Sequence, residues 1–183
     1  MPELMNAWEG LSPPYRTIVA DPPWTYEQGG PTTGFAPLRP PPYSMMTLQE
    51  ITDLPVRSLA APDAHLWLWT TNRYLRASFD VAEAWGFRHS QTLTWCKPPR
   101  GIGPGGAFSN TAEWLLFCRR GSLAPLERID TTWWALPRQA HSVKPQAFMD
   151  LVERVSPGPH VELFARAPRL GWDSWGLGYE GAA

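Results

Sequence analysis

The chain has 183 residues, of which 43% are hydrophobic, and a formal net charge of −1; these values are typical of one folded domain, here residues 1–183, and argue against wholesale disorder. No stretch approaches the roughly 20 apolar residues of a membrane span, and the N-terminus lacks a signal-peptide pattern. The two cysteines, Cys96 and Cys118, lie far apart without ligand-like spacing, so we expect a cytoplasmic, reduced protein with no bound metal and no membrane contact.

Apolar runs alternate with amphipathic segments along the chain. Thr47 followed by Glu50 marks the start of a helix, a closing glycine follows the second helix, and Pro145 is expected in the first turn of the third. In chain order we expect a strand at 17–20, a loop at 31–44, a helix at 46–54, a strand at 64–71, a helix at 73–86, a strand at 88–97, a loop at 98–110, a strand at 112–121, a helix at 144–158 and a last strand at 160–166.

Several of these strands are apolar on both faces, which indicates an α/β fold with a largely parallel sheet covered on both sides. Ligands of such sheets bind beyond the carboxyl ends of the strands. Asp21, residues 70–72 and residues 162–166 all fall at strand ends. We therefore expect them to meet along one edge of the sheet.

The most informative segment is Asp21-Pro22-Pro23-Trp24, directly after the first apolar strand. An exocyclic amine such as that of adenine becomes nucleophilic only when it pyramidalises. A carboxylate and a neighbouring backbone carbonyl can accept its two hydrogens and disperse the developing charge. Two prolines hold that carbonyl rigidly, and an aromatic ring can stack on the base. The alternative is a strand closed by a rigid turn, with Asp21 as a cap.

The segment resembles the catalytic (D/N)-P-P-(Y/F/W) tetrapeptide of amino-group methyltransferases. Its tryptophan form resembles the DPPW adenine-N6 methyltransferase family, which comprises the catalytic subunit of the messenger-RNA N6-adenosine methyltransferase and its bacterial and phage relatives. Nine segments between about residues 15 and 178 match that family in order: YRTIVADPPW, PYSMMTLQEI, LWLWTTN, WGF, TWCK, NTAE, HSVKP, SPGPHVELFAR and GWDSWG. The resemblance implies a Rossmann-like fold that uses S-adenosylmethionine, in the permuted β-type order with the catalytic strand first.

Residue roles follow from the matched motifs. The resemblance implies that Asp21 and the Pro22 carbonyl, backed by Pro23, hold the target amine. It implies that Trp24 and Tyr43 wall the base pocket.

The other matched residues concern the cofactor and the substrate. Lys144 lies in HSVKP, where the family lysine pairs with the cofactor's carboxylate. Glu162, Phe164 and Arg166 lie in the cofactor segment, with Arg166 placed for the ribose hydroxyls. Asn110 and Glu113 match the N-x-x-E segment near the active site.

One departure and one hypothesis complete the predicted site. Relatives carry WGNE or GNQ near the C-terminus, where this chain has Leu177 and Gly178, so contacts to the cofactor adenosine are left open. We expect the two Pro/Gly loops to order over the substrate, with Lys97 and Arg100 contacting phosphates.

The basic pair Arg119–Arg120, before a glycine, is either a solvated turn or a second phosphate contact.

Three alternatives concern function. The first interpretation is a DNA adenine-N6 methyltransferase, because no zinc fingers or helical extension accompany the domain; an RNA substrate is the nearest alternative. Residues 1–83 carry a net charge of −4 and residues 84–183 a net charge of +3, so a nucleic acid should meet the second half. An inactive nucleic-acid-binding partner subunit is disfavoured by the intact tetrapeptide, and methylation of a cytosine amine by its tryptophan. A homo- or heterodimer is compatible with the sequence.

Overall fold

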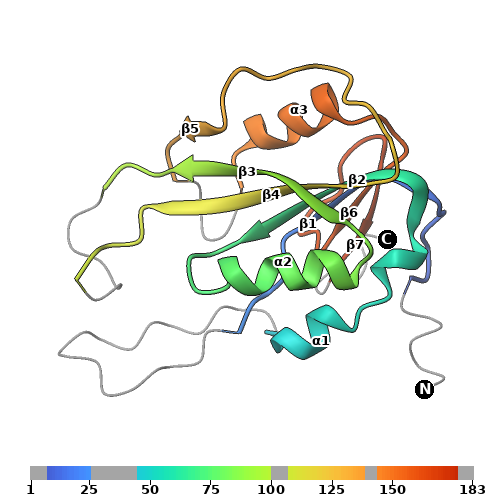
Figure 1. The fold of residues 1–183 in the computed structure, drawn as a ribbon, viewed down its shortest axis with the longest axis horizontal. Coiled ribbons are helices and arrows are strands. Elements are labelled where there is room, and N and C mark those ends of the chain that lie inside the picture. Colours follow the sequence, from blue (N-terminus) through green and yellow to red (C-terminus); the bar gives the residue numbers. More distant parts are fainter. Residues whose placement is uncertain (1–7, 26–44, 100–106, 139–143, 177–183) are drawn as a thin grey trace.

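The computed structural model describes residues 8–25, 45–99, 107–138 and 144–176. Within these ranges the chain forms one seven-stranded sheet in the order β5-β3-β4-β2-β1-β6-β7 (Figure 1). The strands are β1 Tyr15–Ala20, β2 Ala60–Thr70, β3 Arg88–Cys96, β4 Ala112–Arg120, β5 Trp133–Ala135, β6 His160–Leu163 and β7 Trp172–Trp175. The predicted α/β class is confirmed.

The sheet of the described residues is largely parallel, as predicted, with β4 as its one reversed strand. Strand β1 pairs in parallel with β2 and β6, β6 with β7, and β3 with β5. Strand β4 runs antiparallel to both of its neighbours, β2 and β3. The reversal occurs where β3 and β4, consecutive in the chain, are also adjacent in the sheet, an arrangement in which neighbouring strands commonly run antiparallel. Strands β1, β2, β3 and β6 end at the same edge, which we call the catalytic rim because the predicted catalytic tetrapeptide follows β1 there.

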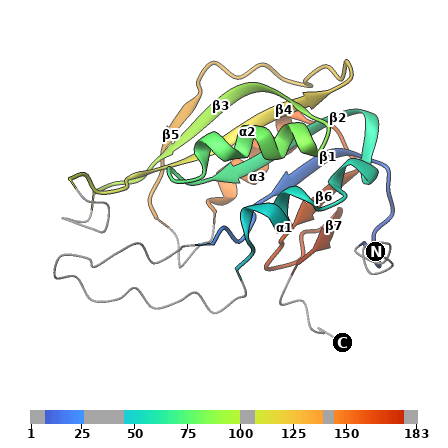
Figure 2. The same ribbon diagram turned by 60° about the horizontal axis from the view of Figure 1, so that its bottom comes forward.

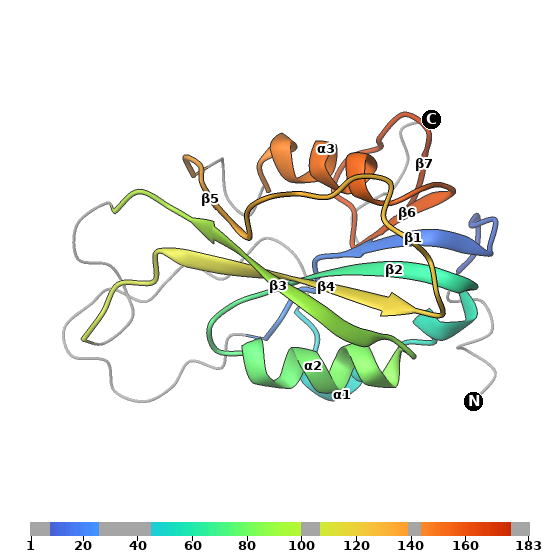
Figure 3. The same cartoon turned by 45° about the horizontal axis from the view of Figure 1, so that its top comes forward.

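Helices cover both faces of the sheet. Helices α1 (Leu48–Thr52) and α2 (Leu75–Ala84) lie on one face (Figure 2), and α3 (Gln146–Val155) lies on the other (Figure 3). A short 3-10 turn, η2 (Val56–Ser58), precedes β2. In the part of the chain that the structure describes, no helix has the length and apolarity needed to cross a membrane.

The central strands contribute to both layers of the core, which explains their apolar sequences. In β2, Leu66 and Leu68 pack on the α1/α2 side, whereas Trp67 and Trp69 pack on the α3 side. All four side chains are at most 2% exposed. Alternation along the strand therefore buries every residue of this segment.

The helix ends show which local signals were correct. Thr47 caps α1 in a complete capping box with Glu50, as predicted. Gly86 follows α2 with φ +86°, the left-handed conformation that glycine adopts without steric cost. Pro145 is the N-cap of α3 rather than a residue of its first turn, because its ψ of 134° is extended.

Two predicted strand features were wrong. Strand β6 ends at Leu163, because Phe164 has φ +63° and turns the chain away. A further strand, β7, follows it, so residues 160–166 do not hold the last strand. An unpredicted edge strand, β5, begins at Trp133, which is 60% exposed.

Candidate active site

The tetrapeptide is anchored on both sides as β1 leaves the sheet. The Pro22 carbonyl accepts a hydrogen bond from the Trp24 N–H at 2.8 Å, which closes a tight turn. The Pro23 carbonyl accepts from the Met46 N–H at 2.9 Å, and the Thr25 N–H donates to the Met46 carbonyl at 3.2 Å. Asp21 and the Pro22 carbonyl are thus held at the catalytic rim by fixed backbone contacts.

Trp24 does not wall a pocket. Its side chain is 4% exposed, and its ring stacks on Tyr74 with ring centroids 5.1 Å apart. Its indole Nε1 donates to the Trp69 carbonyl at 3.2 Å. The expectation that Trp24 faces a base is therefore corrected: the ring belongs to the core and fixes the turn from beneath. Tyr43, expected beside it, lies outside the described residues.

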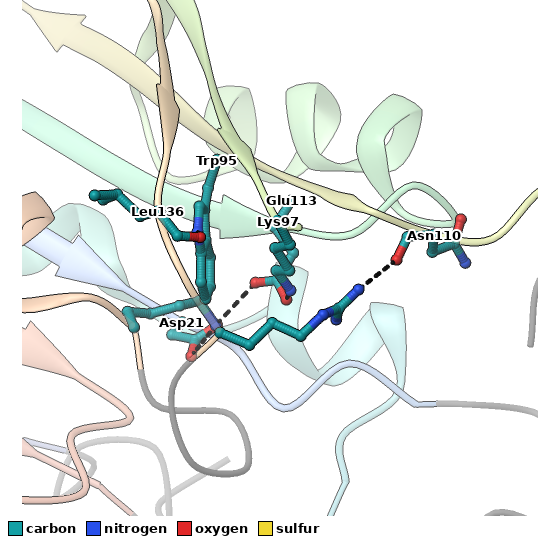
Figure 4. Close-up of polar contacts among 8 residues, drawn as sticks. Asp21, Trp95, Lys97, Asn110, Glu113 and Leu136 are labelled. Carbon is teal, nitrogen blue, oxygen red and sulfur yellow. Dashed lines mark hydrogen bonds and ion pairs between the residues drawn. The ribbon is translucent and has the colours of Figure 1, made fainter. Parts of the chain in front are cut away.

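Four charged side chains from separate elements form one cluster at the rim. Lys144 Nζ donates to Asp21 Oδ2 at 2.7 Å and lies 3.3 Å from Glu113 Oε2. Glu113 Oε1 pairs in turn with Lys97 Nζ (Figure 4). The side chains are only 9–22% exposed. Two acids and two bases alternate, so the cluster has no net charge when all four are ionised.

Burial and pairing oppose each other within this charge cluster. Burial lowers the pKa of Lys144, but the carboxylates of Asp21 and Glu113 outweigh it and raise that pKa above its ordinary value. Burial raises the pKa of Glu113, but the ammonium groups of Lys144 and Lys97 bring it below its ordinary value. For Lys97 burial dominates, and its pKa is lowered despite the contact with Glu113. The cluster therefore persists because each charge has an opposite neighbour.

The predicted cofactor segment lies beside this cluster. Glu162 is the register neighbour of Val19 in β1 and of Ser174 in β7. Burial, reinforced by the negative charge of Asp21, raises its pKa. Phe164 is buried, with its ring edge-on to Trp175 at 5.5 Å between centroids, and Arg166 is exposed. A non-glycine residue at positive φ in this place is the kind of strained backbone that functional sites retain.

The predicted substrate residues separate in the structure. Lys97 is 9% exposed and its ammonium contacts Glu113 and lies over the Trp95 ring at 4.3 Å from the centroid, which does not fit a phosphate contact at the surface. Asn110 is exposed and lies apart from Asp21; its backbone carbonyl accepts from Arg138 Nη2 at 3.2 Å (Figure 4). Arg100 lies outside the described residues, as do Leu177 and Gly178 of the departing C-terminal motif.

The pair Arg119–Arg120 is not a second phosphate contact at this site. Because β4 is antiparallel, Arg120 pairs with Ala64 at the far end of β2 from the catalytic rim. Arg119 Nη2 donates to the Leu123 carbonyl at 2.6 Å, and Arg120 Nη1 to the Arg57 carbonyl at 3.1 Å. Both arginines bind backbone carbonyls at the opposite edge.

Some supporting residues were not found from the sequence. The Trp95 ring lies against the Lys97 ammonium, and the centroid of the Trp69 ring lies 5.2 Å from Lys144 Nζ. The Tyr74 ring stacks on Trp24, and its hydroxyl donates to the Thr25 carbonyl. The available signal was the position of Trp69 and Trp95 near the ends of strands that lead to the rim. A tryptophan near the end of a strand can pack in the core or contact the charged residues of the rim. Trp69 and Trp95 do both.

An aspartate and a proline carbonyl held at the carboxyl end of a central strand, in an α/β sheet with helices on both faces, are the features of a Rossmann-like methyltransferase. The chain belongs to the MT-A70 family, whose model matches residues 15–178. This assignment confirms the predicted family and, with it, the methyltransferase class.

Individual relatives differ in how much of their length the chain covers. It is 30% identical to "Type II methyltransferase M.MunI" of a Mycoplasma species over 181 residues, covering 89% of this chain and 77% of that protein. It is 28% identical to human "N(6)-adenine-specific methyltransferase METTL4", covering 88% of this chain and 37% of that protein. It is 28% identical to "N6-methyladenosine RNA methyltransferase MTA1" of Pyricularia oryzae, covering 90% and 47%. The chain thus spans less than half of these two eukaryotic relatives.

Proposed function

We propose that the protein transfers a methyl group from S-adenosylmethionine to the N6 amine of adenine in DNA. The observation that carries the proposal is the position of the Asp21 carboxylate beside the Pro22 carbonyl at the rim, where Lys144 holds the carboxylate and the Trp24 N–H holds the carbonyl. The bacterial methyltransferase and the N6-adenine-specific human relative support the same chemistry.

The side chains at the rim fit the proposed cofactor. S-adenosylmethionine carries a carboxylate, ribose hydroxyls and a cationic sulfonium. Lys144 offers an ammonium for the carboxylate, while Glu162 and Arg166 offer hydrogen-bonding groups for the hydroxyls. Ser174 Oγ is buried beside Glu162 without a hydrogen-bond partner among the described residues. A bound ligand could supply the hydrogen bond that such a buried hydroxyl requires. The cofactor supplies an electrophilic methyl group when it is bound.

The residues of the chain act on the amine. A carboxylate has two oxygens with about four acceptor positions, so Asp21 can keep its contact to Lys144 and accept one hydrogen of the amine. The Pro22 carbonyl accepts the other, since a carbonyl that already binds the Trp24 N–H has a second lone pair. Both acceptors favour the pyramidal nitrogen and the positive charge that grows on it during attack. Positive charge that develops on the amine is repelled by the Lys144 ammonium. The carboxylates of Asp21 and Glu113 beside Lys144 offset this repulsion, because the charge cluster as a whole is neutral.

DNA is the proposed substrate because the relative covered over most of its length is a type II methyltransferase, whereas the chain covers less than half of the RNA-acting one. In a duplex the adenine amine is paired, so the base must leave the stack or be single-stranded.

The test is expression in a bacterial host that lacks adenine methylation, followed by mass spectrometry of nucleosides from its DNA and RNA. We expect N6-methyldeoxyadenosine in DNA from cells with the wild-type protein and not from cells with Asp21→Ala. Purified protein with labelled S-adenosylmethionine and DNA or RNA oligonucleotides gives the same comparison in vitro.

Other products would replace the proposal. N6-methyladenosine confined to RNA would make the protein an RNA enzyme, and N4-methylcytosine would place another amine in the site. No transfer to any nucleic acid, together with retained nucleic-acid binding, would identify an inactive partner subunit.

A further inference from the structure

We propose that Lys97 is a positioning residue, which acts through Glu113 to hold Lys144 against Asp21. The inference rests on the proposed function of the catalytic rim and gives Lys97 a role other than the phosphate contact expected from its place beside the Pro/Gly loop. Lys97 touches neither Asp21 nor the place of the amine in this arrangement; it acts at the far end of the charge cluster.

The position of Lys97 is fixed on three sides. Its backbone N–H donates to the Thr111 carbonyl at 2.7 Å, at the point where β3 and β4 separate. Its ammonium lies over the Trp95 ring, and the Trp95 Nε1 donates to the Leu136 carbonyl at 2.9 Å, which holds that ring in place (Figure 4). A cation over an indole face is attracted by the ring in addition to its ion pair. Lys97 is therefore a rigid anchor rather than a mobile surface cation.

Lys97 affects the site through Glu113, whose carboxylate lies between two ammonium groups. Among the described residues, Lys97 faces one of its oxygens and Lys144 the other. Arg138 acts on Lys97 with like charge, and Asp21 lies beyond Lys144. Without Lys97, two carboxylates share one ammonium in a site that is mostly buried. Lys144 is then drawn toward Glu113 and away from Asp21, or Glu113 takes up a proton and no longer holds Lys144 on that side; either change moves Lys144 from its place between the two carboxylates.

A phosphate contact makes different demands on a lysine. It needs an ammonium that projects into solvent, where it exchanges condensed counterions for the nucleic acid and makes affinity depend on salt. Lys97 is 9% exposed and already has an acidic partner and a ring beneath it. Displacing it toward a phosphate would leave Glu113 with one cation. The two roles therefore predict different responses to the same substitution.

The experiment compares Lys97→Met, which keeps length and removes charge, with Lys97→Arg, which restores charge. Arg88→Met, at the exposed opposite end of the same strand, is the matched control for losing one positive charge. For Lys97→Met we expect kcat to fall about 10–100-fold, because small displacements in a site cost rates of this order. We expect the acidic limb of the kcat–pH profile to move to higher pH, since Glu113 loses a cation that stabilises its carboxylate.

The nucleic-acid KM and its salt dependence should stay at wild-type values in Lys97→Met, and Lys97→Arg should recover most of kcat. Calorimetry should show weaker binding of S-adenosylmethionine to Lys97→Met, because Lys144 is no longer held in place. A smaller salt slope with unchanged kcat would overturn the proposal and restore the phosphate contact. A lower melting temperature with an unmoved pH profile and unchanged kcat would overturn it in favour of a purely structural lysine.

A second variant covers the case in which Lys97→Met fails to fold. Lys97→Met with Glu113→Gln removes both members of the ion pair and leaves Asp21 with Lys144 alone, so stability should return and cofactor affinity should exceed that of Glu113→Gln with Lys97 intact. Strictly additive effects would contradict the coupling.

The titration of Glu113, followed by NMR in protein without substrate, should shift upward in Lys97→Met. This readout needs no turnover. An inactive wild type would therefore reject the proposed function alone, whereas an unshifted Glu113 would reject the role of Lys97.

Discussion

Replacing Asp21 by asparagine removes one negative charge from the rim and keeps the shape of the side chain. In the wild type this carboxylate is 20% exposed and is held at 2.7 Å by Lys144, so it acts in a partly desolvated site where electrostatic contacts are stronger than in water. Loss of one preorganised group that stabilises transition-state charge costs about 2.7–4 kcal/mol, or about 10²–10³-fold in kcat. We expect Asp21→Asn to fall in this range and Asp21→Ala to fall at least as far.

The same change acts on stability in a way that the structure bounds. Lys144 Nζ keeps Glu113 Oε2 as a partner at 3.3 Å, so the ammonium of Lys144 is not left without an opposite charge. Losing one charge-assisted contact that is partly screened by solvent costs about 1–2 kcal/mol. For a chain of this length that lowers the melting temperature by about 2–8 °C. The protein should therefore remain folded at 25 °C while its turnover is lost.

Single-turnover transfer of labelled methyl groups at saturating cofactor and DNA separates these effects from binding. Asp80→Asn is the matched control, because it makes the same chemical change on the exposed face of α2. Its rate should equal that of the wild type. A rate for Asp21→Asn within about threefold of the wild type would refute the reasoning, because an effect that small leaves no room for a transition-state contact.

Two further predictions concern stability. His65 is fully buried and burial lowers its pKa below 6.5, so the fold favours neutral imidazole: its contribution is complete above pH 6.5 and is lost as pH falls through the unfolded pKa toward the folded one. The unfolding free energy from denaturant titrations should then decrease toward acid more steeply, by at most about 1.4 kcal/mol per pH unit, in the wild type than in His65→Gln, with exposed His89→Gln as control. Gly121→Ala should cost more than Gly10→Ala: both glycines have positive φ, but a Cβ at Gly121 would meet Asp63 Oδ1 at 2.2 Å, whereas one at Gly10 meets nothing within 4 Å. The left-handed conformation alone costs about 1–2 kcal/mol, and equal losses in the two variants would show that Asp63 and the Pro62 carbonyl, 2.6 Å from a Cβ at Gly121, both move aside.

The elements with strong local signals were predictable from the sequence, and those fixed by distant contacts were not. The capping box at Thr47 and the glycine after α2 are local chemistry, and both formed as expected. Strand β5 has three residues and exists because Trp133–Ala135 pair with the end of β3. Strand β7 depends in the same way on β6. Short edge strands carry too little periodicity to be identified before their partners are known.

In the candidate site, too, some features follow from local sequence and others depend on distant contacts. The position of Asp21 and Glu162 at one rim follows from strand ends, which a sequence can locate, whereas Glu113 lies at the start of β4 and reaches the rim only because that strand is antiparallel. The pairing of Lys97 with Glu113 does not follow from strand ends either, because it depends on β4 running antiparallel beside β3. A lysine after a strand suggests an exposed cation, and only the register brings a carboxylate against it. Partners of buried charges are tertiary information.

The core position of Trp24 changes the interpretation of the tetrapeptide. A ring that stacks on a base can be any aromatic, but the indole here also donates from Nε1 to the Trp69 carbonyl near the end of β2. Phenylalanine has no donor for that carbonyl, and tyrosine places its hydroxyl elsewhere on the ring. Because the Trp24 N–H also binds the Pro22 carbonyl, one residue ties the turn to the sheet through its side chain and orients the catalytic carbonyl through its backbone. Under the proposed function, tryptophan at this position serves preorganisation: it fixes the Pro22 carbonyl in advance, so that little reorganisation is needed when charge develops on the amine.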